Sequence, residues 1–262
     1  MTLCHVCRRW QPLALCEDCI RDWAHPQTRC ATCALPLALG CEDPQIFPSH
    51  PHLQCAACAE HPSPLDACVA ALDYAFPWSE GIRRLKFEDA VGLSRPLAAL
   101  MRHTPWAEPL LEQADRVIPM PLSPHRLQTR GYNQALELAR HLAEAPRLDL
   151  HSLQRLETGS HQVGASRAQR LAQAGASFWL APSAVSRLRG QRVVLIDDVM
   201  TTGATLWAAA HLLRQAGACH VAALVLARTP AHAPAYAPAL ARGDADGHRR
   251  QSGDVQHRAG PP

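Results

Sequence analysis

The sequence has no long apolar run, and this absence argues against one class of protein at the outset. Its longest such run, residues 221–227, is far shorter than the roughly 20 residues of a membrane-spanning helix. The first residues, Met1 to His5, also lack the apolar core of a secretory signal peptide. We therefore expect a cytoplasmic protein without a membrane span.

Aromatic residues and net charge are also low. Aromatics make up 5% of the 262 residues and are scattered, and the formal net charge is only +3. A groove that grips single-stranded nucleic acid combines a basic track with stacking aromatic rings. The composition therefore permits a phosphate-bearing partner without arguing for nucleic acid. The length suits one large domain and one small one.

Cysteine, in contrast, is abundant. Ten of the 11 cysteines precede residue 70, and eight form Cys-x-x-Cys pairs: Cys4/Cys7, Cys16/Cys19, Cys30/Cys33 and Cys55/Cys58. Two such pairs close one tetrahedral zinc site, so we expect two structural Zn²⁺ ions, the first held by the first two pairs and the second by the last two. An interleaved pairing stays open, as does Cys41 as a competing ligand. Thioredoxin-like redox chemistry lacks its βαβ context here.

The stretch from Val193 to Thr205 organises the rest of the chain. Four apolar residues predict a buried strand that ends before Asp197 and Asp198, and a Thr- and Gly-rich turn then leads into a helix over 205–215. Backbone N–H groups in such a turn converge on an anion, while paired carboxylates suit the vicinal hydroxyls of a ribose. The alternative is an ordinary turn with Asp198 as a helix cap.

These thirteen residues resemble the 5-phosphoribosyl-1-pyrophosphate (PRPP) motif of type I phosphoribosyltransferases. Around the motif, hydrophobic periodicity and breakers predict further elements. We expect strands over 67–74, 115–121 and 220–227 and helices over 79–86, 93–101 and 135–142.

A basic segment follows the strand at 115–121. Arg126 and Arg130 lie four residues apart, so on a helical turn they face the same way and suit one polyanion. Asn133 and Gln134 add amides before the next helix. A merely solvated basic loop is the alternative. Lys86, at the end of a predicted helix, is either a ligand or a compensation of the helix dipole.

Several motifs together resemble the ComF family in order and spacing, over residues 1 to about 229. They are the paired cysteines, Leu85-Lys86-Phe87, Pro119-Met120-Pro121-Leu122, Arg130-Gly131-Tyr132-Asn133-Gln134 and Asp197-Asp198-Val199-Met200-Thr201-Thr202-Gly203. The resemblance implies a double zinc ribbon over 1–60 and an α/β phosphoribosyltransferase domain, a parallel sheet flanked by helices, over 66–229. The low-complexity composition from residue 230 to 262 predicts a disordered tail.

The resemblance also implies the site. Asp197, Asp198, Arg126 and Arg130 would act in catalysis, with Mg²⁺ accompanying PRPP. Substrate would contact Asp197, Asp198, Thr201, Thr202, Gly203, Ala204, Thr205, Arg130, Asn133, Gln134 and Lys86. Arg155, Thr158, Gln162 and Arg170 match a further family pattern, in which Gln173 replaces the usual Asn. The segment 157–165 is expected to be either a closing loop or a plain surface loop.

Two functions follow as expectations. The first is a PRPP-binding protein, with pentosyl transfer if it is active, in DNA uptake during natural competence or in DNA utilisation. Thr201 replaces the carboxylate of relatives that act on 6-oxopurines, so a hypoxanthine-type acceptor is not expected. The alternative is a non-catalytic module that binds single-stranded DNA or senses PRPP. Competence-machinery proteins are expected partners in either case.

Overall fold

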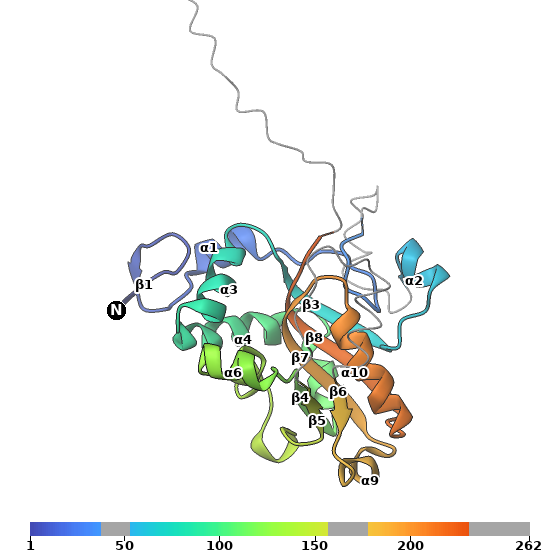
Figure 1. Cartoon of the computed structure of the whole chain (residues 1–262). Helices are drawn as coiled ribbons and strands as arrows, with labels where there is room; N and C mark the ends of the chain where they lie inside the picture. Colours follow the sequence, from blue (N-terminus) through green and yellow to red (C-terminus); the bar gives the residue numbers. More distant parts are fainter. Residues whose placement is uncertain (38–52, 157–177, 231–262) are drawn as a thin grey trace, which may run out of the picture. The chain divides into compact units, whose positions relative to one another are not determined.

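Four parallel strands form the central sheet (Figure 1). The computed structural model describes residues 1–37, 53–156 and 178–230. In spatial order the strands are β3 (Ala67–Asp73), β8 (His220–Arg228), β7 (Arg192–Met200) and β4 (Arg116–Pro119). The two inner strands are the most apolar, because both of their faces are covered.

Helices cover both faces of this sheet (Figure 1). On one face pack α3 (Trp78–Phe87), α4 (Ser94–His103), α5 (Ala107–Glu112) and α7 (Gln134–Ala139). On the other lie α10 (Ala204–Gln215), the antiparallel pair β5 (Leu153–Arg155) and β6 (Phe178–Leu180), and α9 (Ala184–Leu188). Side chains alternate along β7, so Val194 and Ile196 enter the first core while Val193 and Leu195 enter the second.

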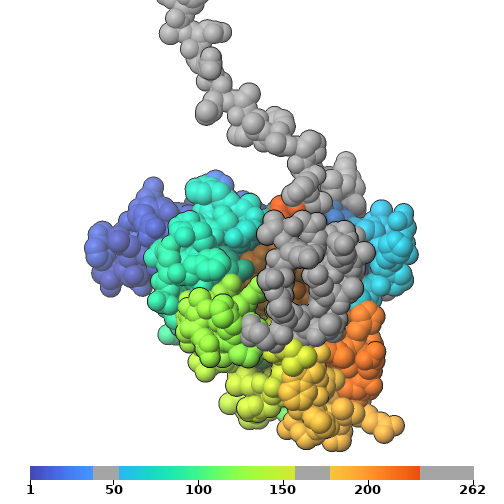
Figure 2. Space-filling model, in the orientation of Figure 1, coloured from blue at the N-terminus to red at the C-terminus, as the bar shows by residue number. Residues whose placement is uncertain are grey.

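The two cysteine-bearing segments join different faces of the sheet. The first contains β1 (Thr2–Leu3), β2 (Trp10–Gln11) and α1 (Glu17–Trp23), and its Leu15 packs into the core beneath α3 and α4. The second contains α2 (Ala56–Glu60) and packs into the core beneath α10. Figure 2 shows the dark-blue first segment beside the teal of α3, and the light-blue residues around α2 beside the orange of α10.

The structure confirms most predicted elements to within three residues and corrects two. The strand expected to end before Asp197 continues to Met200, because Val199 and Met200 still pair with β8. The basic loop contains a helix, α6 (Pro124–Arg130), which Ser123 caps and Gly131 ends at φ +75°.

Short 3₁₀ turns at Val91–Leu93 and Ala145–Arg147 complete the elements of the described part of the chain. None of the helices described is both long and apolar enough to cross a membrane. The predicted tail, apart from Pro230, lies outside the described residues.

Candidate functional site

The turn between β7 and α10 is the centre of the candidate site. We call its residues Thr201–Thr205 the phosphate loop. Gly203 precedes α10 at φ +83°, a left-handed conformation that favours glycine. Within the described residues, the backbone N–H groups of Thr202, Gly203, Thr205 and Leu206 donate to no acceptor. Such free donors at the amino end of a 12-residue helix make a local anion site.

Gly203 also allows a close approach to its neighbours. A Cβ atom at this position would lie 2.6 Å from Met200 Cε and 3.2 Å from Trp207 Nε1. The backbone conformation therefore favours glycine here, and any larger residue would have to displace the methyl group of Met200 and press against Trp207.

The paired aspartates lie on β7 immediately before this loop. Regular alternation of side chains is lost at this end of the strand, since Val199 packs into the core beneath α3 and Met200 into the core beneath α10. Asp198 points toward α3, where it meets Lys86. Each carboxylate accepts a hydrogen bond from the next backbone N–H, at 2.9 Å for Asp197 and 2.7 Å for Asp198. The joint contact with ribose hydroxyls that the sequence suggested stays a prediction.

Electrostatics distinguish the two carboxylates. Asp198 is buried and pairs with Lys86, whose Nζ lies 3.3 Å from its Oδ1. Burial, followed by the negative charge of Asp198, raises the pKa of Asp197 to about 7, against the weaker opposing charges of Lys86 and Arg155. Near neutral pH, Asp197 therefore both accepts and, when protonated, donates hydrogen bonds.

Lys86 is held in place by residues at the start of α7 and just before it. The Tyr132 hydroxyl donates to the carbonyl of Leu85, and Gln134 Nε2 donates to the carbonyl of Lys86 at 3.4 Å. These two bonds fix the end of α3, and the fixed end directs Lys86, the single lysine of the sequence, to Asp198. Lys86 therefore does more than compensate the dipole of α3.

The other predicted polar residues flank this arrangement. Arg130 donates to Gln134 Oε1 at 3.1 Å, and its guanidinium lies 5.0 Å from the centre of the Phe87 ring. Asn133 caps α7 and donates to the carbonyl of Met120 at 3.0 Å. Asn133 and Gln134 thus have structural contacts, and their direct contact with substrate stays a prediction. Arg126 lies one helical turn before Arg130 on α6.

Sequence reasoning missed Arg228, the last residue of β8. Its buried guanidinium donates to the carbonyls of Cys33 at 2.8 Å, Met200 at 3.2 Å and Thr201, all of which come from distant parts of the chain. An arginine at the end of an otherwise apolar strand was the available signal. Its partners were not predictable, because they come together only in the folded chain.

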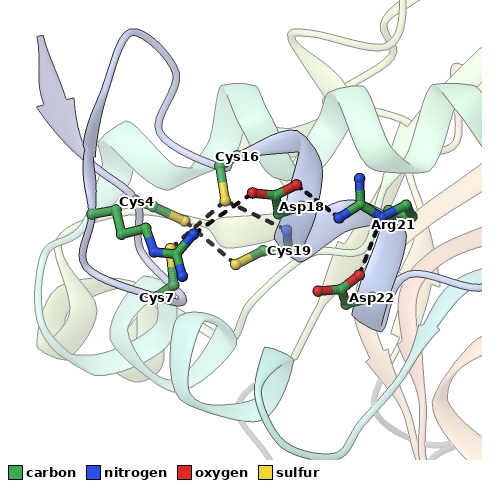
Figure 3. A network of polar contacts seen from close by, with 8 residues as sticks. Cys4, Cys7, Cys16, Asp18, Cys19, Arg21 and Asp22 are labelled. Carbon is green, nitrogen blue, oxygen red and sulfur yellow. Dashed lines mark hydrogen bonds and ion pairs between the residues drawn. The ribbon is translucent and has the colours of Figure 1, made fainter.

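The first cysteine cluster is Cys4, Cys7, Cys16 and Cys19 (Figure 3). Cys4 Sγ lies 3.9 Å from Cys19 Sγ, and Cys7 Sγ lies 3.7 Å from Cys16 Sγ. Tetrahedral zinc with Zn–S bonds of about 2.3 Å separates its sulfurs by about 3.8 Å, so the four thiols fit the ion. In the same view Arg21 bridges Asp18 and Asp22 on α1.

The second cluster is Cys30, Cys33, Cys55 and Cys58, with Cys33 Sγ 3.7 Å from Cys55 Sγ. The sulfurs of each cluster lie within 4.8 Å of one another, which confirms the expected grouping and excludes the interleaved one. Cys68, by contrast, is a buried core residue, and burial raises the pKa of its thiol to about 12.

Other predicted positions lie outside the described residues: Cys41, Thr158, Gln162, Arg170 and Gln173. The described part of the chain also contains a cavity of about 340 Å³. It is lined by residues at the amino ends of strands, among them Asp66, Arg192 and His220, whereas the phosphate loop follows the carboxyl end of β7.

Several known proteins are similar to this chain in sequence. A family model described as "Phosphoribosyl transferase domain" matches residues 127–237. The DNA utilization protein YhgH of Escherichia coli O6:H1 is 33% identical over 238 residues, which are 87% of this chain and 97% of that protein. Competence protein F of Haemophilus influenzae is 33% identical over 169 residues, 62% of this chain and 73% of that protein. The chain belongs to the ComF family.

This ComF-family protein therefore has the fold of a type I phosphoribosyltransferase, with cysteine clusters at its amino-terminal end. Among solved structures it is similar to one described as the allosteric regulatory enzyme of purine biosynthesis. The TM-score is 0.34 at 18% identity, with 55% of this chain and 30% of the other covered.

Proposed function

We propose that this ComF-family protein binds PRPP, or a closely related ribose 5-phosphate, at the carboxyl end of β7. The observation that carries the proposal is the phosphate loop, whose free N–H groups begin α10 directly after Asp197 and Asp198. These donors suit the 5-phosphate. The adjacent carboxylates suit the ribose hydroxyls, with Asp197 protonated in part near neutral pH.

The basic residues have the complementary role. Arg126 and Arg130 on α6 are proposed to neutralise the pyrophosphate, and Lys86 to hold the Asp198 side chain in place through their ion pair. Mg²⁺, when bound with PRPP, would shield the pyrophosphate charge and bind through oxygen atoms, which Asp197 and Asp198 could offer directly or through water.

Pentosyl transfer is the reaction that this site would support. The leaving pyrophosphate gains negative charge in the transition state, and Arg126 and Arg130 would stabilise it by charge and position alone. Thr201 offers a hydroxyl rather than a carboxylate, so we propose an acceptor other than a 6-oxopurine. We further propose that the activity belongs to DNA uptake or DNA utilisation, the processes after which the relatives are named.

Calorimetric titration with PRPP and Mg²⁺ tests the binding. The wild type should bind, and Asp197→Asn/Asp198→Asn should lose at least about tenfold in affinity, since it removes both carboxylates. Lys86→Met should also weaken binding. The matched control Arg83→Met removes one charge from the exposed side of α3 and should leave PRPP binding unchanged. No heat with the wild type would refute the proposal.

The single lysine gives an independent readout. Acetylation of Lys86, followed by mass spectrometry, should slow when PRPP and Mg²⁺ are present, because the ligand would cover the Lys86–Asp198 pair. The α-amino group of Met1 is the internal control and should react at an unchanged rate. Equal protection of both amines would indicate a general effect rather than binding at this site.

A second candidate function is the binding of single-stranded DNA. The observation that favours it is Trp10 on β2, 70% exposed and directly preceded by the exposed Arg8 and Arg9, in a chain whose relatives are named for DNA use. Trp10→Ala should then weaken oligonucleotide binding about tenfold, with a steep salt dependence, while Trp179→Ala on β6 should not. Salt-independent binding, or equal effects of the two variants, would exclude this role.

A further inference from the structure

The buried guanidinium of Arg228 joins the second cysteine cluster to the phosphate loop. We propose that Arg228 is a positioning residue through which metal binding at the second cluster sets the shape, and hence the PRPP affinity, of the phosphate loop. The affinity part of this inference rests on the proposed function. The first cluster is proposed to have no such effect.

The hydrogen bonds of Arg228 provide the first observation. Its Nε donates to the carbonyl of Cys33, a candidate metal ligand, at 2.8 Å. Its Nη1 donates to the carbonyls of Met200 at 3.2 Å and of Thr201, where the phosphate loop begins. One planar guanidinium group thus links the Cys33 turn to the start of the loop.

Charge provides a second reason for the coupling. No carboxylate of the described residues lies within ion-pair distance of Arg228, although its side chain is buried. A zinc ion with four thiolates carries a net charge of −2, so a filled second cluster compensates the nearby guanidinium. Without the ion, Arg228 would lose this compensation and the fixed Cys33 carbonyl, and a buried charge without its partners is costly.

Strand β3 forms a separate path between the same two regions, through one backbone hydrogen bond and side-chain packing. The backbone N–H of Cys68 donates to the carbonyl of Ala31, inside the Cys30–Cys33 turn, at 2.7 Å. The Cys68 thiol lies 3.6 Å from Met200 Sδ, and the methyl group of Met200 lies against Gly203. A shift of the turn would therefore reach the phosphate loop through the core as well as through Arg228.

The first cluster lacks both paths. Its neighbour Leu15 packs into the core on the other face of the sheet. Within the described ranges, no hydrogen bond or ion pair joins Cys4, Cys7, Cys16 or Cys19 to the phosphate loop. It is therefore the natural control for a general effect of zinc on stability.

Three measurements on the full-length protein test the coupling: zinc content, PRPP affinity by calorimetry, and hydrogen exchange of the backbone amides at 199–206. Arg228→Met should keep both zinc ions, bind PRPP about tenfold more weakly and exchange faster in the loop. Arg228→Lys keeps the positive charge but loses the forked geometry of the guanidinium group. Its loss of PRPP affinity should therefore be smaller than that of Arg228→Met. Cys33→Ser should lose one zinc ion and weaken PRPP binding to a similar extent.

Matched controls separate coupling from instability. Cys16→Ser removes the zinc of the first cluster and should change affinity less than twofold. Arg214→Met removes another arginine that bonds a distant carbonyl, that of Pro64 at 2.9 Å, and should also leave affinity and loop exchange unchanged. In the double variant Arg228→Met/Cys33→Ser, the two losses of PRPP affinity should not add, since both substitutions break the same connection from Cys33 through Arg228 to the loop.

Several results would overturn the inference. If both Arg228 variants keep two zinc ions, bind PRPP within twofold of the wild type and leave loop exchange unchanged, Arg228 does not position the loop. Equal losses in Cys16→Ser and Cys33→Ser would show a general effect of zinc. If the wild type binds no PRPP, the proposed function fails, and hydrogen exchange in the same variants then decides the coupling alone.

Discussion

Asp197 should make the stability of the protein depend on pH around neutrality. Burial and the charge of Asp198 raise its pKa to about 7, from a usual value of 3.8. Between these two values the folded state holds a proton that the unfolded state has released, so the free energy of unfolding falls as pH rises toward 7. The difference corresponds to about 4 kcal/mol in all, and about 1 kcal/mol of it is lost between pH 6 and pH 8.5.

Asp197→Asn removes this titration while keeping the size of the side chain. The free energy of unfolding of the variant, relative to the wild type at the same pH, should therefore rise by about 1 kcal/mol from pH 6 to pH 8.5. Chemical denaturation at both pH values with excess zinc measures it, and comparison at equal pH cancels the contribution of the cysteine clusters.

Asp198→Asn is the informative companion. It removes the neighbouring negative charge, so the pKa of Asp197 should fall and the pH dependence between pH 6 and pH 8.5 should shrink. A difference between Asp197→Asn and the wild type that is the same at both pH values would refute the reasoning, because it would place the pKa of Asp197 well outside this range.

Three further predictions concern the loop, a buried ion pair and the metal sites. Gly203→Ala should destabilise the protein by at least about 2 kcal/mol in chemical denaturation, because strain at positive φ adds to the clash with Met200. Gly131→Ala, at positive φ in open space, should cost only about 1 kcal/mol, and equal losses would contradict the clash. Arg29→Met breaks the largely buried pair with Asp73, whose atoms lie 2.8 Å apart, and should cost about 3 kcal/mol; the exposed Arg21→Met should leave stability nearly unchanged. A chelator should release zinc from the first cluster, where Cys7 is exposed, before the second, and a metal-sensitive dye should show that Cys7→Ser abolishes the fast phase; a single phase would contradict this.

Local sequence patterns located the two cysteine clusters and the Thr- and Gly-rich loop after β7, because each of these motifs is contiguous or nearly so. The Cys-x-x-Cys pairs were grouped correctly, since pairs that follow one another along the chain need only a loop between them to share one ion. The predicted end of strand β7, before Asp197, was wrong. The strand continues because Val199 and Met200 pair with β8, and this is a tertiary contact that composition does not reveal. Helix α6 was predicted only as a helical turn carrying Arg126 and Arg130, because it lacks an apolar face; its Ser and Gly caps were the local signal for the full helix.

By itself, the sequence determined the parallel α/β fold, the loop that follows Asp198 and the two sets of four cysteines. Only the tertiary structure decided that Lys86 pairs with Asp198 and that the two clusters pack on different faces of the sheet. It also decided the partners of Arg228, which lies 195 residues from Cys33 and 28 from Met200. The physical reason is that a motif records which groups are neighbours along the chain, whereas charge pairing and burial depend on which groups are neighbours in space.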